Sequence, residues 1–174
     1  VLDDHQVKAT FFFAGLRIEQ YSEAAKEVCR RGHQIGNHSY SHHRLVGRSL
    51  KFIRSEIEAT DRLIRALGVT DEIPFRAPYT AKFLTLPYFL TRTKRLHILF
   101  DTAPMPRDTW GAPVEAVAAS IAQQARPGSI IALHDGNLKA GLWIANYTDA
   151  VIRDLKKKGF RFCTVSELIN ANRN

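Results

Sequence analysis

Residues 32–42 read Gly32-His33-Gln34-Ile35-Gly36-Asn37-His38-Ser39-Tyr40-Ser41-His42, a short apolar segment that leads into two histidines. We predict a strand over residues 34–37, so both histidines follow directly after a strand. At the spacing of His38 and His42, two imidazole rings on one helical turn or in a tight loop can share a metal ion. Surface histidines also fall at this spacing by chance. The pair alone therefore leaves open a metal site and a merely solvated or core-packed pair.

Segments typical of buried strands alternate with segments typical of helices along the whole chain. Such alternation predicts an α/β protein whose parallel strands are covered by helices. The length of 174 residues is enough for one domain with a substantial core, and we expect a single domain over residues 1–174. We expect strands at 10–14, 34–37, 73–76, 97–101, 129–133 and 160–165, and helices at 19–31, 49–67, 83–95, 113–125 and 146–158, with a last helix capped by Ser166.

Polar residues that can carry chemistry follow several of these predicted strands. His38, Arg76, Asp101 and His134 each stand just after one of them. Functional groups of parallel α/β folds gather at the carboxyl ends of their strands. The common placement therefore predicts one shared site.

Each of these residues has a chemical and a structural interpretation. His134 suits a general acid or base, because imidazole titrates near neutral pH, but a histidine at a strand end is often only hydrogen-bonded structure. Arg76 could hold a carboxylate and lower its pKa, or form a surface ion pair. Asp101 and Asp108 could each orient His134, as the acid of a catalytic triad orients its base.

Two aromatic residues are candidates for substrate contacts. Tyr79 follows Pro78 in a predicted turn, where a backbone N–H could face a developing oxyanion. Trp110 could stack on the face of a sugar ring, or simply anchor its loop.

The chain is basic, with a net charge of +8 and a pI of about 9.8. Such a charge could favour nucleic acid, anionic lipid or an anionic cell-wall polymer. The lysines and arginines are scattered, however, and no basic run is interleaved with aromatic residues as in single-strand binders. We therefore expect no nucleic-acid partner. We also expect no membrane segment, because no apolar run is long enough to span a bilayer.

Several motifs in a fixed order resemble one family over nearly the whole chain, the polysaccharide deacetylases of the NodB-homology type (carbohydrate esterase family 4). His38-Ser39-Tyr40-Ser41-His42 is similar to the family's His-[Ser/Thr]-x-x-His metal motif, and Arg76-Ala77-Pro78-Tyr79 to its Arg-x-Pro-Tyr motif. The segments 7–12 and 160–168 are similar to the family's second strand and to its ending, and Leu133-His134 to its Leu-x-His motif.

The resemblance implies a distorted (β/α) barrel and a divalent metal, usually zinc. It implies a hydrolase that removes acetyl groups from an amino-sugar polymer or oligosaccharide, chitin-like or peptidoglycan, outside the cell, in the periplasm or in the cell envelope. By matching positions, the resemblance implies that His38 and His42 bind the metal and that His134 gives a proton to the leaving amine. It implies that Arg76 braces the catalytic base and that the Tyr79 backbone N–H donates to the oxyanion. Trp110 and Leu133 would line the substrate groove.

The sequence departs from the family pattern at three places. The family's Thr-Phe-Asp-Asp-Gly motif, whose aspartates would be the catalytic base and a third metal ligand, is absent, and Asp3-Asp4 stands too close to the second strand to replace it. We therefore expect the barrel's first strand to precede Val1, and residues 1–174 alone to be poorly active. The Asp-x-x-Asp-Trp segment is stretched, from Asp101 to Asp108-Thr109-Trp110, which leaves open which aspartate pairs with His134. Leu133 directly precedes His134, one position closer than in the family.

Two functions compete on this basis. The leading one is a metal-dependent deacetylase of acetylated polysaccharides or oligosaccharides. The alternative is a catalytically inactive carbohydrate-binding or scaffold domain of the same fold, because the acid pair is missing. The polymer, the metal and the oligomeric state are left open by the sequence.

Overall fold

The computed structural model describes residues 1–104, 112–134 and 141–171, and their contacts group into two compact units. The histidine-motif unit comprises Thr10–Leu99, and the helical unit comprises Val1–Ala9 together with Phe100–Asn174. The predicted single domain over the whole chain stays a prediction. In the described part of the chain, no helix combines the length and the apolar character that a bilayer crossing requires.

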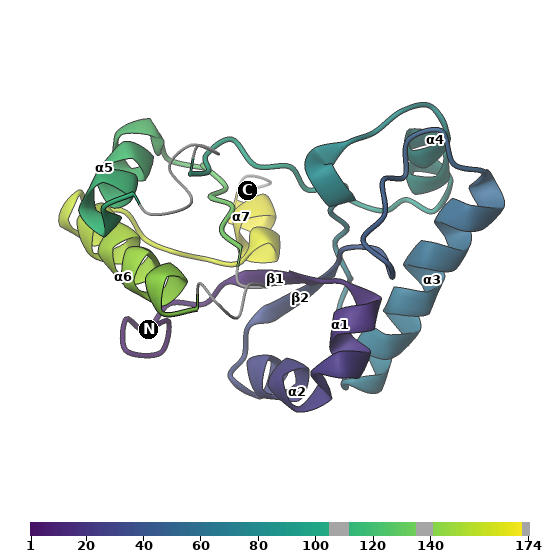
Figure 1. Ribbon diagram of the computed structural model, residues 1–174, viewed down its shortest axis with the longest axis horizontal. Coiled ribbons are helices and arrows are strands. Elements are labelled where there is room, and N and C mark those ends of the chain that lie inside the picture. Colours follow the sequence, from purple (N-terminus) through teal and green to yellow (C-terminus); the bar gives the residue numbers. More distant parts are fainter. Residues whose placement is uncertain (105–111, 135–140, 172–174) are drawn as a thin grey trace. The chain divides into compact units, whose positions relative to one another are not determined.

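The histidine-motif unit begins with a parallel β-α-β arrangement (Figure 1). Strand β1 (Thr10–Phe13) pairs with β2 (Gln34–Asn37) in a register that sets Phe12 opposite Gly36. Two short helices, α1 (Gly15–Gln20) and α2 (Ser22–Arg30), connect the strands. Gly36 allows this pairing to be close, since a Cβ there would lie 2.6 Å from Cδ1 of the Phe12 ring.

The parallel arrangement continues beyond β2 through single bridges. Asn37 bridges to Phe75, and Phe75 bridges to His97. The backbone bonds are Asn37 N to Pro74 O at 2.8 Å and Arg76 N to Asn37 O at 2.9 Å. Phe75 therefore lies beside β2 and His97 lies beside Phe75, but the strands predicted at 73–76 and 97–101 are reduced to these isolated bridges.

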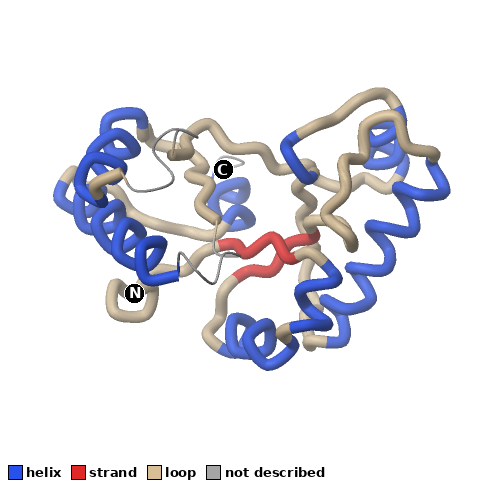
Figure 2. The backbone as a smooth tube through the Cα atoms, viewed as in Figure 1, coloured by secondary structure: helices blue, strands red, loops and turns tan. Residues whose placement is uncertain are grey.

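Helix α3 (Leu50–Ala66) covers this arrangement and contributes to its core (Figure 2). Its first turn is capped by Ser49, whose hydroxyl accepts from the Phe52 N–H at 3.2 Å. The buried face recurs every three or four residues, as expected for an amphipathic helix. Its buried residues, together with α4 (Thr85–Arg92), form a core around Phe75, which is fully buried. Buried residues of this face are Ile53, Glu56, Ile57, Thr60 and Ile64.

The helical unit is built on the packing of α5 (Val114–Gln124) against α6 (Gly141–Lys157), followed by α7 (Val165–Ala171). A parallel bridge joins Thr102 to Ile131. Residues 1–9 of this unit are held against α6, because the His5 ring lies 2.7 Å from a carboxylate oxygen of Asp149.

Most predicted helices are confirmed in position, with shifted ends. The single helix predicted at 19–31 is wrong, because α1 and α2 separate at Tyr21, and Ser166 lies inside α7 instead of capping it. The helix predicted at 83–95 is α4, which begins at Thr85. It accommodates Pro87 in its first turn, because N–H groups there have no partner within the helix. The last long helix begins at Gly141, earlier than the predicted residue 146. The strand predicted at 160–165 is wrong: residues 160–164 form neither strand nor helix, and α7 begins at Val165.

Candidate functional site

The loop from His38 to His42 obtains its hydrogen bonds from side chains. The Ser39 N–H donates to Asn37 Oδ1 at 2.8 Å, and the His42 N–H donates to Ser39 Oγ at 3.2 Å. The N–H groups of Tyr40 and Ser41 both donate to Glu56 Oε2, at 3.1 and 2.9 Å. Four consecutive amides, those of residues 39–42, are thus bonded to side-chain oxygens, which helps the loop to hold one shape outside any helix or strand.

Left-handed backbone turns bend the loop so that both histidines lie on one side. Ser39 has φ of 63° and His42 has φ of 58°. Such values cost about 1 kcal/mol or more for residues with a Cβ, and they persist only where surrounding contacts enforce them. The hydrogen bonds just described are such contacts. The loop geometry is therefore set by its surroundings, not by local preference.

Helix α1 holds the loop from its other side. The first amides of α1, Gly15 N and Leu16 N, donate to the carbonyl oxygens of Ser39 and Tyr40, each at 3.0 Å. A Cβ at Gly15 would lie 2.4 Å from Tyr40 Cδ2 and 2.9 Å from Thr60 Oγ1. Only glycine therefore permits this approach of helix to loop without displacement.

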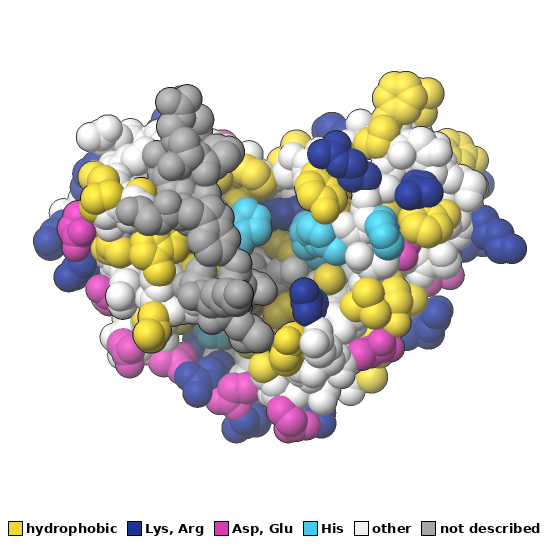
Figure 3. Space-filling model, in the orientation of Figure 1, with side chains coloured by type: hydrophobic (Ala, Val, Ile, Leu, Met, Phe, Trp, Pro, Cys, Tyr) yellow, Lys and Arg dark blue, Asp and Glu magenta, His cyan; other side chains and the backbone are white. Residues whose placement is uncertain are grey.

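The two histidine rings lie together at the surface of the histidine-motif unit. Their centroids are 4.9 Å apart at an interplanar angle of 66°. His38 Nδ1 lies 2.8 Å from the carbonyl oxygen of Arg76, which assigns the proton to Nδ1 and the lone pair to Nε2. A histidine whose far nitrogen bonds a backbone carbonyl is the usual arrangement at metal centres. Figure 3 shows histidine side chains at the surface beside hydrophobic and basic ones.

This donor set fits part of a metal site. Two neutral imidazoles suit zinc and similar divalent ions, which catalytic sites usually hold with three protein ligands. Within residues 1–104, 112–134 and 141–171, no three His, Cys, Asp or Glu side chains come together in a way that could hold an ion. His38 and His42 therefore account for two ligands and leave the third unassigned.

Arg76 is partly buried behind the histidines. Its guanidinium lies 4.2 Å from the centroid of the Phe12 ring, and its Nε donates to the Ile98 carbonyl at 3.2 Å. Burial lowers the pKa of Arg76 to about 10, so the group still carries its charge at neutral pH. A positive charge held in a half-buried position suits the predicted role of bracing a carboxylate, a role that stays a prediction.

Tyr79 closes the same side of the site. It stands in a short 3-10 turn, Pro78–Thr80, with φ of 59°. Its ring centroid lies 5.1 Å from that of His42, and the Arg44 guanidinium lies 4.8 Å from the ring centroid. The turn therefore brings Tyr79 next to a candidate ligand, where its backbone can serve a substrate.

The remaining candidates belong to the helical unit. His134 is exposed at its surface, and Leu133 packs against the α5–α6 core. The Asp101 carboxylate accepts from Ser129 Oγ at 2.7 Å and from the Ile130 N–H at 2.8 Å.

Burial acts to raise the pKa of Asp101, but the hydrogen bonds from Ser129, from the Ile130 N–H and from its own backbone, together with the charge of Arg126, hold the pKa below its ordinary value. Asp101 thus secures the turn before residue 131. Its predicted pairing with His134 stays a prediction. Asp108 and Trp110 lie outside the described residues.

The sequence reasoning missed three residues that shape the loop: Asn37, Glu56 and Asp61. Asn37 and Glu56 are buried, with exposed fractions of 0% and 7%. The sequence contains one signal that could have identified Glu56: it stands three residues after Ile53, on the apolar face of a predicted helix. A carboxylate at such a position is rarely buried without partners, so it points to donors on a facing segment.

Comparison with solved structures defines the class of fold. A peptidoglycan N-acetylglucosamine deacetylase crystallised with a hydroxamate-type benzamide matches at a TM-score of 0.85 and 28% identity, over 96% of this chain and 77% of the other. A family 4 acetyl xylan esterase from Clostridium thermocellum, in complex with a cobalt ion, matches at a TM-score of 0.84 and 28% identity, over 98% of this chain and 80% of the other. A carbohydrate esterase family 4 pseudoenzyme from Bacillus anthracis, at 0.82 and 23%, covers 96% and 57% and adds evidence for the fold alone. The fold is the distorted (β/α) barrel of the NodB type, as predicted.

Comparison of sequences defines the family. A family model described as "Polysaccharide deacetylase" matches residues 1–96. A peptidoglycan-N-acetylglucosamine deacetylase of Bacillus cereus is 30% identical over 172 residues, which cover 97% of this chain and 78% of the relative. A chitooligosaccharide deacetylase of Azorhizobium caulinodans is 32% identical over 138 residues, covering 78% and 64%. This chain covers 62% of the length of a second Bacillus cereus relative, also described as a peptidoglycan-N-acetylglucosamine deacetylase. The chain belongs to the polysaccharide deacetylase family.

Proposed function

We propose that this chain is the catalytic domain of a metal-dependent deacetylase that acts on N-acetylated amino-sugar polymers or oligosaccharides, of the peptidoglycan or chitin type. One observation carries the proposal: His38 and His42 lie side by side on a braced loop, and the Arg76 carbonyl directs the Nε2 lone pair of His38 outward from that contact. The relatives described as acting on peptidoglycan and chitooligosaccharides support the substrate class.

In this proposal His38 and His42 hold a divalent ion, zinc or a similar metal. When bound, such an ion supplies Lewis-acid stabilisation of charge on the acetyl carbonyl. Arg76 keeps a nearby carboxylate ionised, and the Tyr79 backbone N–H donates to the developing oxyanion. By the family resemblance, His134 gives a proton to the leaving amine, and Leu133 and Trp110 contact the sugar. Asp101 or Asp108 orients His134.

The second candidate is a non-catalytic carbohydrate-binding domain of the same fold. One observation favours it: within the residues that the structure describes, no third His, Cys, Asp or Glu side chain joins His38 and His42 to complete a metal site. A domain without a complete metal site can keep the sugar contacts and lose turnover. Binding and catalysis must therefore be measured on the same samples.

The test compares acetate release with binding. The protein, together with any residues that naturally precede Val1, is loaded with Zn²⁺ or Co²⁺ and incubated with chitin oligosaccharides, peptidoglycan and acetylated xylan, beside the same protein carrying His42→Ala. Metal-dependent acetate release from the N-acetylated substrates, lost in the variant, supports the deacetylase. Sugar binding without acetate release supports the binding domain and overturns the enzymatic proposal.

A further inference from the structure

Helix α3 presents two carboxylates toward the His38–His42 loop. Glu56 reaches the loop directly, because its Oε2 accepts from the N–H groups of Tyr40 and Ser41. The Ser41 hydroxyl also donates to Glu56, at 2.9 Å from each carboxylate oxygen. An ionised acceptor forms hydrogen bonds about twice as strong as a neutral one. Glu56 is therefore the main anchor for the middle of the loop.

Asp61 reaches the loop through Asn37. The Asn37 amide donates to Asp61 Oδ1 at 2.7 Å and to the Ile57 carbonyl at 2.8 Å, so both of its amide hydrogens are used. Its oxygen then faces the Ser39 N–H at 2.8 Å. Two acceptors on α3 thus decide which way the buried amide points. A reversed amide would set oxygen against oxygen at Asp61 and donor against donor at Ser39.

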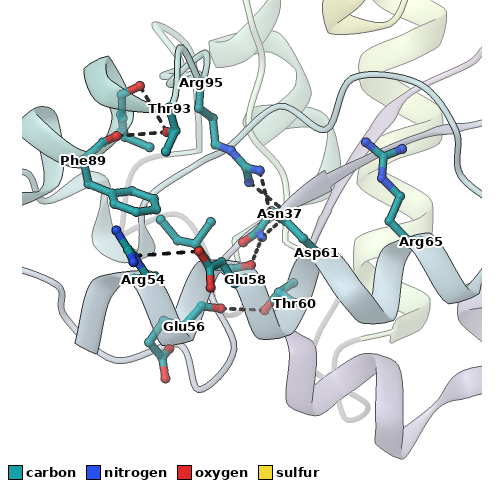
Figure 4. Close-up of polar contacts among 12 residues, drawn as sticks. Asn37, Arg54, Glu56, Glu58, Thr60, Asp61, Arg65, Phe89, Thr93 and Arg95 are labelled. Carbon is teal, nitrogen blue, oxygen red and sulfur yellow. Dashed lines mark hydrogen bonds and ion pairs between the residues drawn. The ribbon is translucent and has the colours of Figure 1, made fainter. Parts of the chain in front are cut away.

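Arg95 completes the arrangement on the far side of Asp61. Its Nη1 lies 2.9 Å from Asp61 Oδ1, and its Nη2 lies 2.5 Å from Oδ2. The two side chains are only 19% and 20% exposed, so this bidentate pair is well shielded. Figure 4 shows Asn37, Asp61 and Arg95 pointing toward one another, while Glu58 of the same helix pairs with Arg54 instead.

We propose that Glu56 and Asp61 are positioning residues for the metal ligands. Glu56 acts directly and Asp61 acts through Asn37. Together they enforce the left-handed backbone at Ser39 and His42, and so they set the separation of the two rings and the affinity for a divalent ion. The part of this inference that concerns metal rests on the proposed function. The part that concerns loop geometry does not.

The substitutions are chosen by counting the hydrogen-bond acceptors that each one removes. Asn37 and Arg95 Nη1 share Oδ1 of Asp61, and Arg95 Nη2 uses Oδ2. Asp61→Asn sets an amide N–H against the donors on one of these two sides, and it removes the charge that strengthens the bond from Asn37. Glu56→Gln removes the charge and one acceptor while keeping the size of the side chain. Glu58→Gln is the matched control, because it makes the same change on the same helix at a 52% exposed position, 3.8 Å from Arg54.

The first measurement is residue-resolved amide hydrogen exchange of the metal-free protein. We expect exchange at Ser39 to speed up by about tenfold or more in Asp61→Asn, and exchange at Tyr40 and Ser41 to do so in Glu56→Gln, as the loss of one local hydrogen bond implies. Amides of β1 should keep their protection in both variants, and Glu58→Gln should match the parent. Unchanged exchange at these sites, or equal acceleration throughout the unit, overturns the inference.

The second measurement is Zn²⁺ affinity, determined by competition with a chelator. Loss of residues that orient metal ligands typically lowers affinity by about 10- to 100-fold. We expect such a loss in Asp61→Asn and Glu56→Gln and an unchanged affinity in Glu58→Gln. Equal affinities in all of them, with a parent that binds, overturn the metal part. A parent that binds no Zn²⁺ overturns the proposed function, while the exchange data still decide the loop geometry.

Discussion

The Nδ1 atom of His38 lies 2.8 Å from the carbonyl oxygen of Arg76, so the histidine motif and the Arg-Ala-Pro-Tyr motif are joined by a hydrogen bond. The bond orients the His38 ring and holds its proton on Nδ1. On the other side of the same turn, the Ala77 N–H donates to His97 Nε2 at 3.3 Å. Residues far apart in the sequence thus fix a single backbone turn from both of its faces.

Removing either ligand histidine should abolish stoichiometric metal binding. His38→Ala and His42→Ala each leave one imidazole, which is too few for a stable zinc site. The measurement is metal content after dialysis against a metal-containing buffer. His5→Ala is the control, because His5 pairs with Asp149 in the helical unit. Equal metal content in parent and ligand variants would show that the pair is not a metal site.

Replacing Arg76 should move the pH dependence of activity. In Arg76→Ala, the carboxylate that serves as base loses a cation that favours its ionised form, so its pKa rises. The acidic limb of the kcat/KM profile should therefore shift to higher pH. The control is Arg54→Ala, whose side chain is 60% exposed. A profile with an unmoved acidic limb would restrict Arg76 to a structural role.

Replacing His134 should lower turnover more than binding. A general acid typically contributes about 10²- to 10⁴-fold, so kcat of His134→Ala should fall by that order. The exposed position of His134 means that its removal leaves the core intact. Steady-state kinetics on an N-acetylated oligosaccharide give kcat and KM separately. A kcat within threefold of the parent, at any KM, would contradict the assigned role.

His97 should make the protein less stable as the pH falls below neutrality. Burial, then the positive charges of Lys82 and Arg76, lowers the pKa of His97 from its ordinary value of 6.5. The unfolded chain then binds the proton more readily, so the free energy of unfolding rises with pH between the folded-state pKa and about 6.5. Protonation would also remove the acceptor that the Ala77 N–H uses.

Urea denaturation at a series of pH values checks this dependence. His97→Asn, which cannot titrate, should flatten the slope below about pH 6.5 relative to the parent. A slope that is the same in both proteins would remove His97 as its cause.

A methyl group at Gly15 should destabilise the histidine-motif unit. The added Cβ of Gly15→Ala would lie 2.4 Å from Tyr40 Cδ2, so helix and loop must move apart. Overpacking of this kind costs about 1–3 kcal/mol of unfolding free energy. Gly141→Ala is the matched control, since Gly141 also begins a helix and, in the part of the chain that the structure describes, no atom lies within 4 Å of its added Cβ. Urea denaturation of both variants measures the difference. A Gly15→Ala protein as stable as its control would contradict the close approach.

Local periodicity was enough to locate most elements of this chain. The apolar runs at β1 and β2, and the three-to-four repeat of α3, depend on which faces must leave water, and such patterns are written in neighbouring residues. The motif at His38 could be placed after a strand for the same reason, whereas the strands predicted before Arg76 and His134 are single bridges at Phe75 and Ile131. The segment at 160–165 has a strand pattern too, but a ladder needs a partner strand, and the structure supplies none to these residues.

The bracing of the histidine loop could be decided only by the tertiary structure. By itself, the sequence determined the alternation of strands and helices and the two histidines that follow β2. It did not determine the left-handed turns at Ser39 and His42, which local sterics disfavour. Those turns exist because Glu56 and Asn37 accept the loop's N–H groups, and because Gly15 admits α1 to its carbonyl side. Hydrogen bonds between residues distant in sequence depend on packing in three dimensions, so no local pattern could have predicted them.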